Sequence, residues 1–576
     1  MQRLILALST AALLSGCANV RLPAFHRAHF EPVVTCEQLT AFAIPASAIG
    51  LPTRGARIIS ARSMAATEAQ VHPGNDSWQH ALPAHCQLIG EIDPIDRKAP
   101  VIQFQLNVPT AWNGRAMQIG GGGLNGSIPT NLAVMTASGS PVSAAMPPDV
   151  QYPLSQGYAL FGGDSGHQGP AGDWALNDEA WLNFAHAGLK KTHDATVAVL
   201  ERLYGQRPRT TYFMGTSQGG REALEVAQRY PEDYDGVMAS VPLIGYTAHA
   251  VAKTIFATQQ TGLGWIPPSA AALIAKEVVQ QCDGLDGLTD GVISNYRGCN
   301  ALFNDERGAS AYEAIRCRDV ASPSTAATIQ VHSPVSCLSD AQIATAVRMR
   351  SPTVFGFPLA HGYNVLPAYG TGREHSGWLN ITPQPKVGEQ PNLGQPGTTV
   401  QYGILKDPML NLLDFRLDVH QEKIQAASAL IDSTNHDLSR FFARGGKLII
   451  KSSSSDYAVN PQMLATWYEA VIARHGIAEV ERRIRYYVLP NTGHSGDGAS
   501  LTTSMPIPSR IDMISLLTNW VEQGHTPPDA PVAATMDRLP PFTVRATKPM
   551  CRYPLYPHYK GHGNPNNYDS YECTGS

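Results

Sequence analysis

The sequence predicts an α/β fold with a parallel sheet and a large insertion, and three observations lead to this prediction. Strand and helix patterns alternate from about residue 158 to 242 and again from 445 to 522, as in a parallel sheet covered by helices. Residues 211–224 combine a short apolar strand, a glycine-flanked Ser217 and the start of a helix. From 244 to 435 proline-rich loops and short helical stretches replace the alternation, which indicates an insertion over the sheet.

Length and composition are those of a large globular protein. The chain has 576 residues, of which 43% are hydrophobic and 16% charged, so we expect two to four domains, or one domain with a large insertion. The formal net charge of -4 gives no electrostatic footprint for nucleic acid or for an anionic membrane. Composition says nothing about the oligomeric state.

Residues 1–17 have the pattern of a signal peptide. A positively charged start is followed by an apolar run over residues 4–14 and by Leu-Ser-Gly-Cys, which ends at Cys17. This apolar run is too short to span a bilayer. The last four residues resemble a bacterial lipobox, so we expect cleavage before Cys17 and lipid attachment to its sulfur, with an ordinary cleaved signal as the alternative. Either reading places the protein in the cell envelope, in the periplasm or on the outer membrane, or outside the cell.

The other eight cysteines also favour export. None has the C-x-x-C spacing of a zinc or redox site, and disulfides in an oxidising compartment are the simpler interpretation. Proximity in the sequence suggests four local pairs: Cys36 with Cys86, Cys282 with Cys299, Cys317 with Cys337, and Cys551 with Cys573.

The N-terminal part leads into a glycine run. Residues 84–92 and 101–108 alternate as strands do, and a further strand over 116–119 enters four consecutive glycines, 120–123. The run is either a plain flexible loop or a loop whose backbone N–H groups face a nucleophile. The serine turn favours the second reading, because glycines let the backbone approach a substrate oxygen closely.

Ser217 is the candidate nucleophile. The pattern Gly215-x-Ser217-x-Gly219 fits a sharp strand-to-helix turn, which crowds the positions two residues away and leaves room only for glycine there. The helical pattern at 180–204 precedes this turn, and a strand at 234–242 follows it. As a bare pattern G-x-S-x-G is common, so the partners of the serine decide its meaning.

An acid and a base follow in the expected order. In serine turns of this kind the chain order is Ser, then Asp or Glu, then His, each after a later strand. Asp456 follows the apolar strand that begins at 445, and His494 follows the strand that begins at 484. We therefore predict a catalytic triad of Ser217, Asp456 and His494. The oxyanion would be bound by the backbone N–H groups of Gln218 and Gly120.

Several motifs resemble the tannase and feruloyl esterase family. They are spread from the first cysteine pair to the C-terminal part: Trp112-Asn-Gly-Arg115, the glycine loop with Asn125-Gly126, Gly215-Thr-Ser-Gln-Gly-Gly-Arg-Glu222, Tyr230-Pro-Glu-Asp-Tyr-Asp-Gly-Val237, the Cys282–Gly291 segment, Asp437-Leu-Ser-Arg-Phe441, Gly445-Gly-Lys-Leu-Ile-Ile450 and Gly493-His494.

The resemblance implies an α/β-hydrolase fold with a large inserted lid domain. We expect a catalytic domain made of residues 36–243 and 436–576 and a lid at 244–435. The resemblance also implies a serine carboxylesterase that hydrolyses hydroxycinnamoyl, galloyl or related phenolic esters through an acyl-enzyme. Esters like mono(2-hydroxyethyl) terephthalate are the alternative substrates, although no convincing match to the arginine segment used for terephthalate is found. A serine peptidase and a non-catalytic binding lipoprotein on the same fold stay open as well.

An acidic turn in the lid is a candidate calcium site. Asp283, Asp286 and Asp290 lie within eight residues, interleaved with glycines, which suits a hard cation, although such turns are often only solvated. The resemblance implies a structural Ca²⁺ held by these aspartates and by the backbone oxygens of Leu288 and Val292. The Cys282–Cys299 pair would then brace the same loop.

Some positions depart from the family pattern. Family members carry a disulfide between the positions of Thr216 and Ser495, so the two catalytic loops here lack that covalent restraint. A serine run before Asp456 also replaces the usual histidine-glycine step.

Glu374 and Trp378 resemble the lid segment that faces the substrate pocket, and the alternative for Trp378 is a place in the lid core.

Overall fold

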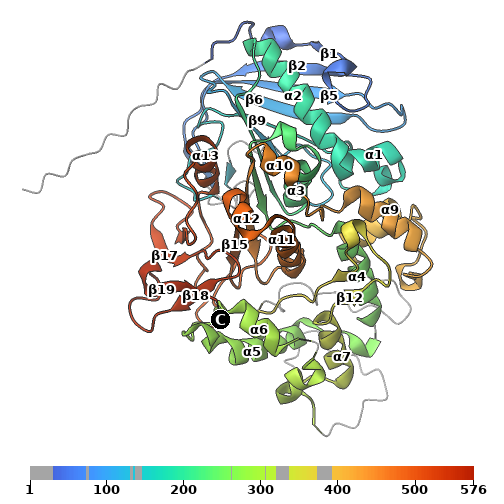
Figure 1. Ribbon diagram of the computed structural model, residues 1–576, viewed down its shortest axis with the longest axis vertical. Helices are drawn as coiled ribbons and strands as arrows, with labels where there is room; N and C mark the ends of the chain where they lie inside the picture. The colour runs from blue at the N-terminus through green and yellow to red at the C-terminus, as the bar shows by residue number, and fades with distance from the viewer. Residues whose placement is uncertain are drawn as a thin grey trace, which may run out of the picture.

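A ten-stranded sheet forms the centre of the protein (Figure 1). The computed structural model describes residues 30–72, 77–129, 134–135, 146–260, 262–304, 306–318, 336–372 and 392–575. The strands lie in the order β1 (Ala43–Ile44), β2 (Ala56–Met64), β5 (His85–Ile92), β6 (Ile102–Pro109), β9 (Ala159–Gly163), β7 (Arg115–Ile119), β10 (Thr210–Thr216), β11 (Gly236–Ser240), β14 (Lys447–Ser453) and β15 (Ile484–Leu489).

The sheet has two halves of different character. From β9 and β7 through β10, β11 and β14 to β15 every pairing is parallel, which confirms the α/β prediction for this half. The strands β1, β2, β5, β6 and β9 pair antiparallel instead, in a part of the sheet whose strand pairing the sequence did not predict. The connections from β2 to β5 to β6 contain no crossover helix, and strands joined without one run antiparallel.

Helices cover both faces of the parallel half. Alternate residues of the strands face opposite sides: Phe213 and Val237 pack towards α3, whereas Met214 and Met238 pack towards α13. The helices of the catalytic part are α1 (Asp178–Leu182), α2 (Gly188–Tyr204), α3 (Gln218–Arg229), α10 (Ser439–Ala443), α11 (Pro461–His475), α12 (Ile477–Arg483) and α13 (Met513–Gln523).

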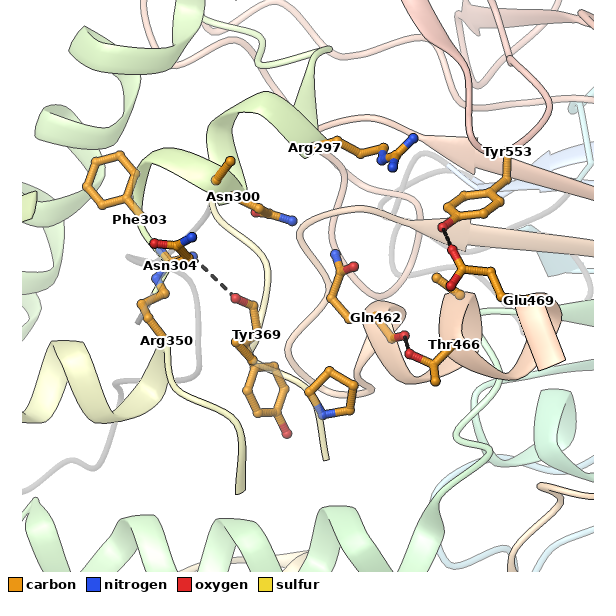
Figure 2. Close-up of a pocket in the computed structure, with 14 residues that line it drawn as sticks. Arg297, Asn300, Phe303, Asn304, Arg350, Tyr369, Gln462, Thr466, Glu469 and Tyr553 are labelled. Atoms are coloured by element: carbon orange, nitrogen blue, oxygen red, sulfur yellow. Dashed lines mark hydrogen bonds between the residues drawn. The ribbon is translucent and has the colours of Figure 1, made fainter. Parts of the chain in front are cut away.

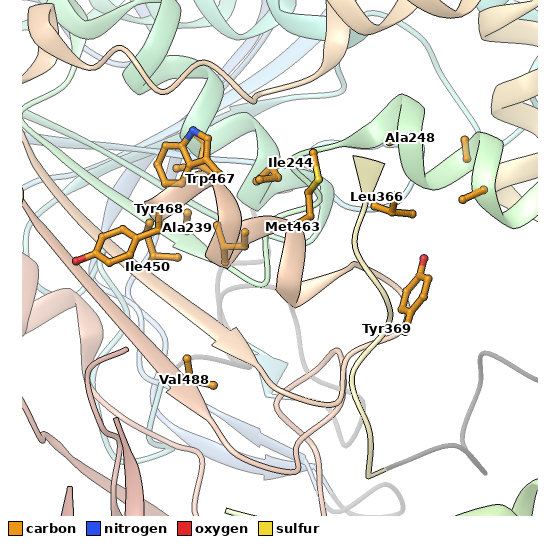
Figure 3. Packing of buried hydrophobic residues seen from close by; sticks show 14 of the residues in the cluster. Ala239, Ile244, Ala248, Leu366, Tyr369, Ile450, Met463, Trp467, Tyr468 and Val488 are labelled. Carbon is orange, nitrogen blue, oxygen red and sulfur yellow. The ribbon is translucent and has the colours of Figure 1, made fainter. Parts of the chain in front are cut away.

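The inserted region continues the core on the α3 side. One buried cluster extends from Ile450 of the sheet through Met463 of α11 to Ala248 and Leu366 of the insertion (Figure 3). Its elements are α4 (Tyr246–Gln259), α5 (Pro268–Cys282), α6 (Tyr296–Leu302), α7 (Asp340–Met349), β12 (Thr353–Val354), β13 (Val365–Leu366), α8 (Gln395–Thr398) and α9 (Gln421–Ile431).

The two ends of the insertion meet at its base. The Ser433 backbone N–H donates to the Ile244 carbonyl (2.9 Å), and the Thr247 N–H donates to the Asp432 carboxylate (2.7 Å). A lid over 244–435 therefore starts and stops at one place on the fold, although the domain boundaries themselves stay a prediction.

Small sheets complete the chain and were not foreseen from the sequence. Two hairpin-like pairs follow α13, and a three-stranded sheet lies in the N-terminal part. Their strands are β3 (Gln70–His72), β4 (Ser77–Gln79), β8 (Val134–Met135), β16 (Val532–Met536), β17 (Val544–Pro549), β18 (Tyr556–Tyr559) and β19 (Tyr571–Thr574).

The four disulfides join the cysteines that the sequence suggested: Cys36–Cys86, Cys282–Cys299, Cys317–Cys337 and Cys551–Cys573. Cys17 and the signal pattern lie outside the described residues. Among the helices of the described part, none combines the length and the apolarity needed to span a bilayer.

Candidate active site

Ser217 occupies a strained turn between β10 and α3. Its backbone has φ 65° and ψ −121°, a region that residues with a β-carbon rarely adopt. A Cβ added to Gly215 would lie 2.0 Å from the Gly219 carbonyl oxygen, and one on Gly219 would lie 2.5 Å from that of Gly121. Both glycines are therefore required by space, as the sequence pattern predicted.

The structure brings Ser217, His494 and Asp456 together. His494 Nε2 lies 2.7 Å from Ser217 Oγ, and His494 Nδ1 lies 2.8 Å from Asp456 Oδ2. The residues follow β10, β15 and β14, which are near neighbours at one end of the parallel half. With Nδ1–H donated to the carboxylate, Nε2 is free to accept the serine proton.

Burial and hydrogen bonds hold the side chain of Asp456 in place. Its side chain is fully buried, and its second oxygen accepts the backbone N–H groups of Ala458 (2.9 Å) and Val459 (3.1 Å). Burial acts to lower the pKa of His494, but the charge and the hydrogen bond of Asp456 outweigh it, so the pKa is raised above its ordinary value. The contact with Asp456 therefore stabilises the imidazolium that His494 becomes when it accepts the serine proton.

The glycine loop corrects one prediction. The Gly120 N–H donates to the Met214 carbonyl (2.9 Å), because the pairing of β7 with β10 continues one residue beyond the strand end. Gly120 is therefore not available as an oxyanion donor. Among the described residues, the N–H groups of Gly122 and Gln218 have no acceptor, and the space around Gly122 is open, since a Cβ there would meet nothing within 4 Å.

A buried carboxylate that sequence reasoning missed holds this loop. Glu222 of α3 accepts the Gly121 N–H (2.8 Å) and the Asn125 side-chain amide (2.8 Å), with the Ser165 hydroxyl at 3.4 Å. Burial raises the pKa of Glu222, against the opposing effects of the Arg221 charge and of these hydrogen bonds. The sequence did offer one signal for Glu222, namely a charged residue within the first turns of the helix that follows Ser217.

Some predicted positions are not placed beside the triad. Glu374 and Trp378 lie outside the described residues, so their proposed substrate contacts stay predictions. Thr216 ends β10 and Ser495 is exposed, and neither residue is part of a disulfide. The catalytic loops are thus joined here by the hydrogen bonds of the triad.

The acidic turn fits a hard cation by the chemistry of its donors. Asp283 and Asp286 are buried; burial and the nearby charge of Asp290 raise their pKa values, that of Asp286 to about 6. Among the described residues, no group donates a hydrogen bond to the Leu288 or Val292 carbonyl. Oxygen donors that repel one another in a buried loop are stabilised by a divalent ion. Lys548 is a competitor, because its Nζ lies 3.1 Å from Asp290.

A second cluster of possible metal ligands is already neutralised by a lysine. The ligand atoms of His193, Asp194 and Asp233 all lie within 4.8 Å of one another. The Lys190 ammonium lies 2.8 Å from Asp194 and 2.9 Å from Asp233, where it supplies the positive charge that an ion would bring.

A cavity of about 390 Å³ lies apart from the triad, between α6, α11 and the segment that contains Tyr369 (Figure 2). Its lining includes the half-exposed polar groups of Asn300 and Gln462, and the Tyr553 hydroxyl, which donates to Glu469 (2.6 Å). The triad residues do not line it, so it is not the catalytic pocket.

Comparisons with known proteins agree with this geometry. The family model for tannase and feruloyl esterase matches residues 86–574. The chain is 33% identical to an uncharacterized esterase of Agrobacterium fabrum, covering 100% of this chain and 99% of the relative. It is 29% identical to the mono(2-hydroxyethyl) terephthalate hydrolase of Piscinibacter sakaiensis, covering 86% and 85%. Feruloyl esterase B from Aspergillus oryzae superimposes with a TM-score of 0.72 at 20% identity, covering 94% of this chain and 100% of that one. The chain therefore belongs to the tannase and feruloyl esterase family and is a carboxylic ester hydrolase with an α/β-hydrolase fold.

Proposed function

We propose that the protein is a serine carboxylesterase that hydrolyses aromatic esters through an acyl-enzyme. The observation that carries the proposal is the continuous chain of contacts from Ser217 Oγ to His494 and from His494 to Asp456. A serine is a weak nucleophile unless a base takes its proton, and the base works only in the tautomer that the acid holds.

Each step uses a group of this chain. Ser217 Oγ attacks the ester carbonyl carbon while its proton moves to His494 Nε2, and the carbonyl oxygen becomes an oxyanion. The free N–H groups of Gln218 and Gly122 bind that oxyanion, with Gly122 in the role first expected of Gly120. His494 then protonates the departing alcohol. A water molecule attacks the acyl-enzyme by the same route and releases the acid.

Family membership and the activities for which the relatives are named support an aromatic acyl group. Feruloyl esters and tannins carry phenolic acids, and we propose hydroxycinnamoyl or galloyl esters as the first substrate class. Terephthalate monoesters are the second class, supported by the relative named for mono(2-hydroxyethyl) terephthalate. Glu374 and Trp378 would contact the acyl group.

We further propose that the acidic turn binds a structural Ca²⁺. Asp283, Asp286 and Asp290 would supply carboxylate oxygens, and Leu288 and Val292 carbonyl oxygens. The ion would neutralise the mutual repulsion of the aspartates and brace the lid loop that the Cys282–Cys299 disulfide closes.

An exported protein is the simplest interpretation of four disulfides together with the signal pattern of residues 1–17. We propose attachment to the cell envelope through lipid on Cys17. Metabolic labelling with a fatty acid would mark the wild-type protein and leave a Cys17→Ala variant unlabelled, whereas equal labelling of both would contradict the anchor.

An ester panel tests the activity. We expect turnover of methyl ferulate, methyl gallate or mono(2-hydroxyethyl) terephthalate by the wild type, none by Ser217→Ala, and no cleavage of a peptide library. Cleavage of peptides in preference to all three esters would favour a peptidase. A folded wild-type protein that turns over neither esters nor peptides would favour the binding protein.

A further inference from the structure

Helix α3, which begins directly after the nucleophile, binds the segment where the lid returns to the sheet. Arg229 donates to the Ala429 and Leu430 carbonyls (3.1 and 3.4 Å), and Glu225 accepts the Ser433 hydroxyl (2.6 Å). Arg229 and Glu225 are four residues apart and therefore share a face of α3. The helix of the nucleophile is thus also the helix that fastens the lid.

Arg221 connects this contact with the first residue of the helix. Its side chain is fully buried, with 0% of its surface exposed. Nη1 donates to the Ile431 carbonyl of the lid (3.1 Å), and Nε donates to the side-chain oxygen of Gln218 (2.9 Å). One planar guanidinium therefore spans the base of the lid and the residue next to Ser217.

Two carbonyls of an irregular helical turn complete the surroundings of Arg221. Residues Asn183–Ala187 form a π-helical turn, a conformation that is rare and often found at functional sites. The Ala185 carbonyl accepts from Nη1 (2.7 Å), and the Phe184 carbonyl accepts from Nη2 (3.2 Å). A buried charge is costly unless its N–H groups have acceptors, so Arg221 holds the π-helical turn, the lid segment and Gln218 together.

The side chain of Gln218 depends on its contact with Arg221. It is 1% exposed, and its amide nitrogen has no acceptor among the described residues, so the bond from Arg221 is the one that orients it. The backbone N–H of Arg221 also donates to the Ser217 carbonyl (3.0 Å). A strained turn persists only where the surrounding contacts hold it in place, and Arg221 supplies two such contacts.

We propose that Arg221 is a positioning residue for the oxyanion hole. It holds Gln218 so that the backbone N–H of this residue points at the carbonyl oxygen of the substrate, and it ties that orientation to the base of the lid. The inference rests on the proposed function, in which the Gln218 N–H binds the oxyanion. The aim of this donor matters, because it stabilises the transition state only at hydrogen-bond distance from the developing charge.

A transition-state analogue separates positioning from stability. With trifluoromethyl phenyl ketone, Ser217 Oγ bonds to the carbonyl carbon, its proton moves to His494 Nε2, and the carbonyl oxygen becomes an oxyanion that has no leaving group to expel. The inhibition constant Ki of this ketone therefore reports the oxyanion hole, whereas the melting temperature reports the fold.

Gln218→Met is the first test. The variant keeps the backbone N–H and the three carbonyl acceptors of Arg221, but it lacks the side-chain oxygen that Arg221 holds. We expect kcat/KM for the best ester of the panel to fall about tenfold, with KM nearly unchanged and Ki of the ketone raised by the same factor. This variant decides the assignment even if a change at Arg221 prevents folding.

Arg221→Lys should have a larger effect on the same two quantities. Lysine keeps the positive charge but lacks the planar fork, so it cannot bind Gln218 and the carbonyls together. We expect kcat/KM to fall roughly 10- to 100-fold and Ki to rise in parallel. The variant with both changes should have the same Ki as Arg221→Lys alone, since both changes remove one shared contact.

Arg229→Met is the control on the same helix. Arg229 also donates to carbonyls of the lid segment, but its charge pairs with Glu225 and, among the described residues, it has no hydrogen bond with Gln218. This variant should lower the melting temperature and leave kcat/KM and Ki unchanged.

Three outcomes would overturn the assignment. An unchanged Ki in folded Gln218→Met would refute the role of the side-chain contact and leave the esterase standing. Additive effects of the two changes on Ki, or an equal rise of Ki in Arg229→Met, would show that Arg221 acts only through the stability of the lid base. A folded wild-type protein that neither hydrolyses the esters nor binds the ketone would remove the proposed function and the inference together.

Discussion

The catalytic end of the sheet and the lid helix α4 differ in whether their charged side chains have partners among the described residues. At the sheet, the ionisable groups Asp456, His494 and Glu222 all have partners within the protein. On α4, Lys253 lies over the Tyr369 ring, and no carboxylate of the described residues forms an ion pair with it. A fully paired site is preorganised and loses nothing to rearrangement during the reaction. The contrast suggests that the sheet carries the chemistry and the lid selects the substrate.

Loss of the acid should have the largest effect. In Asp456→Asn the amide no longer holds His494 in the required tautomer, so we expect kcat to fall roughly 10⁴-fold with every ester alike. Circular dichroism and the melting temperature would show that the variant is folded. A loss that affects only carboxylate-bearing esters would place Asp456 on the substrate side and break the division between sheet and lid.

Glu222→Gln should produce a smaller loss, confined to kcat. The amide presents a donor or a weaker acceptor to the Gly121 N–H, so the glycine loop loses its anchor and the oxyanion donor is misplaced. We expect kcat to fall roughly 10- to 100-fold, with KM nearly unchanged.

Glu225→Gln is the matched control for this variant. Glu225 is also a buried carboxylate of α3, but it pairs with Arg229 and accepts from Ser433 instead of the glycine loop. This control should lower the melting temperature and spare kcat. Equal losses of kcat in both variants would mean that Glu222 acts only through stability.

These residues also show what the sequence was able to predict. Ser217, Asp456 and His494 follow from chain order and from their places after strands, and Gly215 and Gly219 from the space at the turn. Gly120 was wrongly predicted as an oxyanion donor, because the hydrogen bonding of β7 with β10 runs one residue past the alternating pattern and takes up its N–H.

Other features depend on tertiary contacts, so their local sequence signal is weak. Glu222 has a spacing that ordinary helices share, and only the fold shows that it holds the glycine loop. The antiparallel pairing of the N-terminal strands and the pairs β16–β17 and β18–β19 were missed for the same reason, since strand pairing joins residues distant in sequence.

The pH dependence should report the contact between acid and base. Asp456 raises the pKa of His494 above its ordinary value, and only the neutral imidazole accepts the serine proton. Activity should therefore be present above this raised pKa and fall about tenfold per pH unit below it. A profile of kcat/KM whose acid limb lies below pH 6.5 for a neutral ester would contradict the raised pKa.

Calcium removal should have the smallest effect on the chemistry, because the acidic turn belongs to the lid. Chelation should lower the melting temperature by several degrees, and calcium should restore it, since a ligand that binds only the folded state stabilises it. Asp286→Asn should lower the melting temperature and abolish its response to calcium. An unchanged melting temperature, with no metal in the purified protein, would refute the site.

The central claim is that Ser217 is a nucleophile activated by His494. Intact-mass measurement after incubation with a fluorophosphonate at neutral pH tests it most directly. We predict one adduct per chain, mapped to Ser217, with labelling that slows as the pH falls through the raised pKa of His494 and is absent in Ser217→Ala. A folded wild-type protein that stays unlabelled would contradict the account.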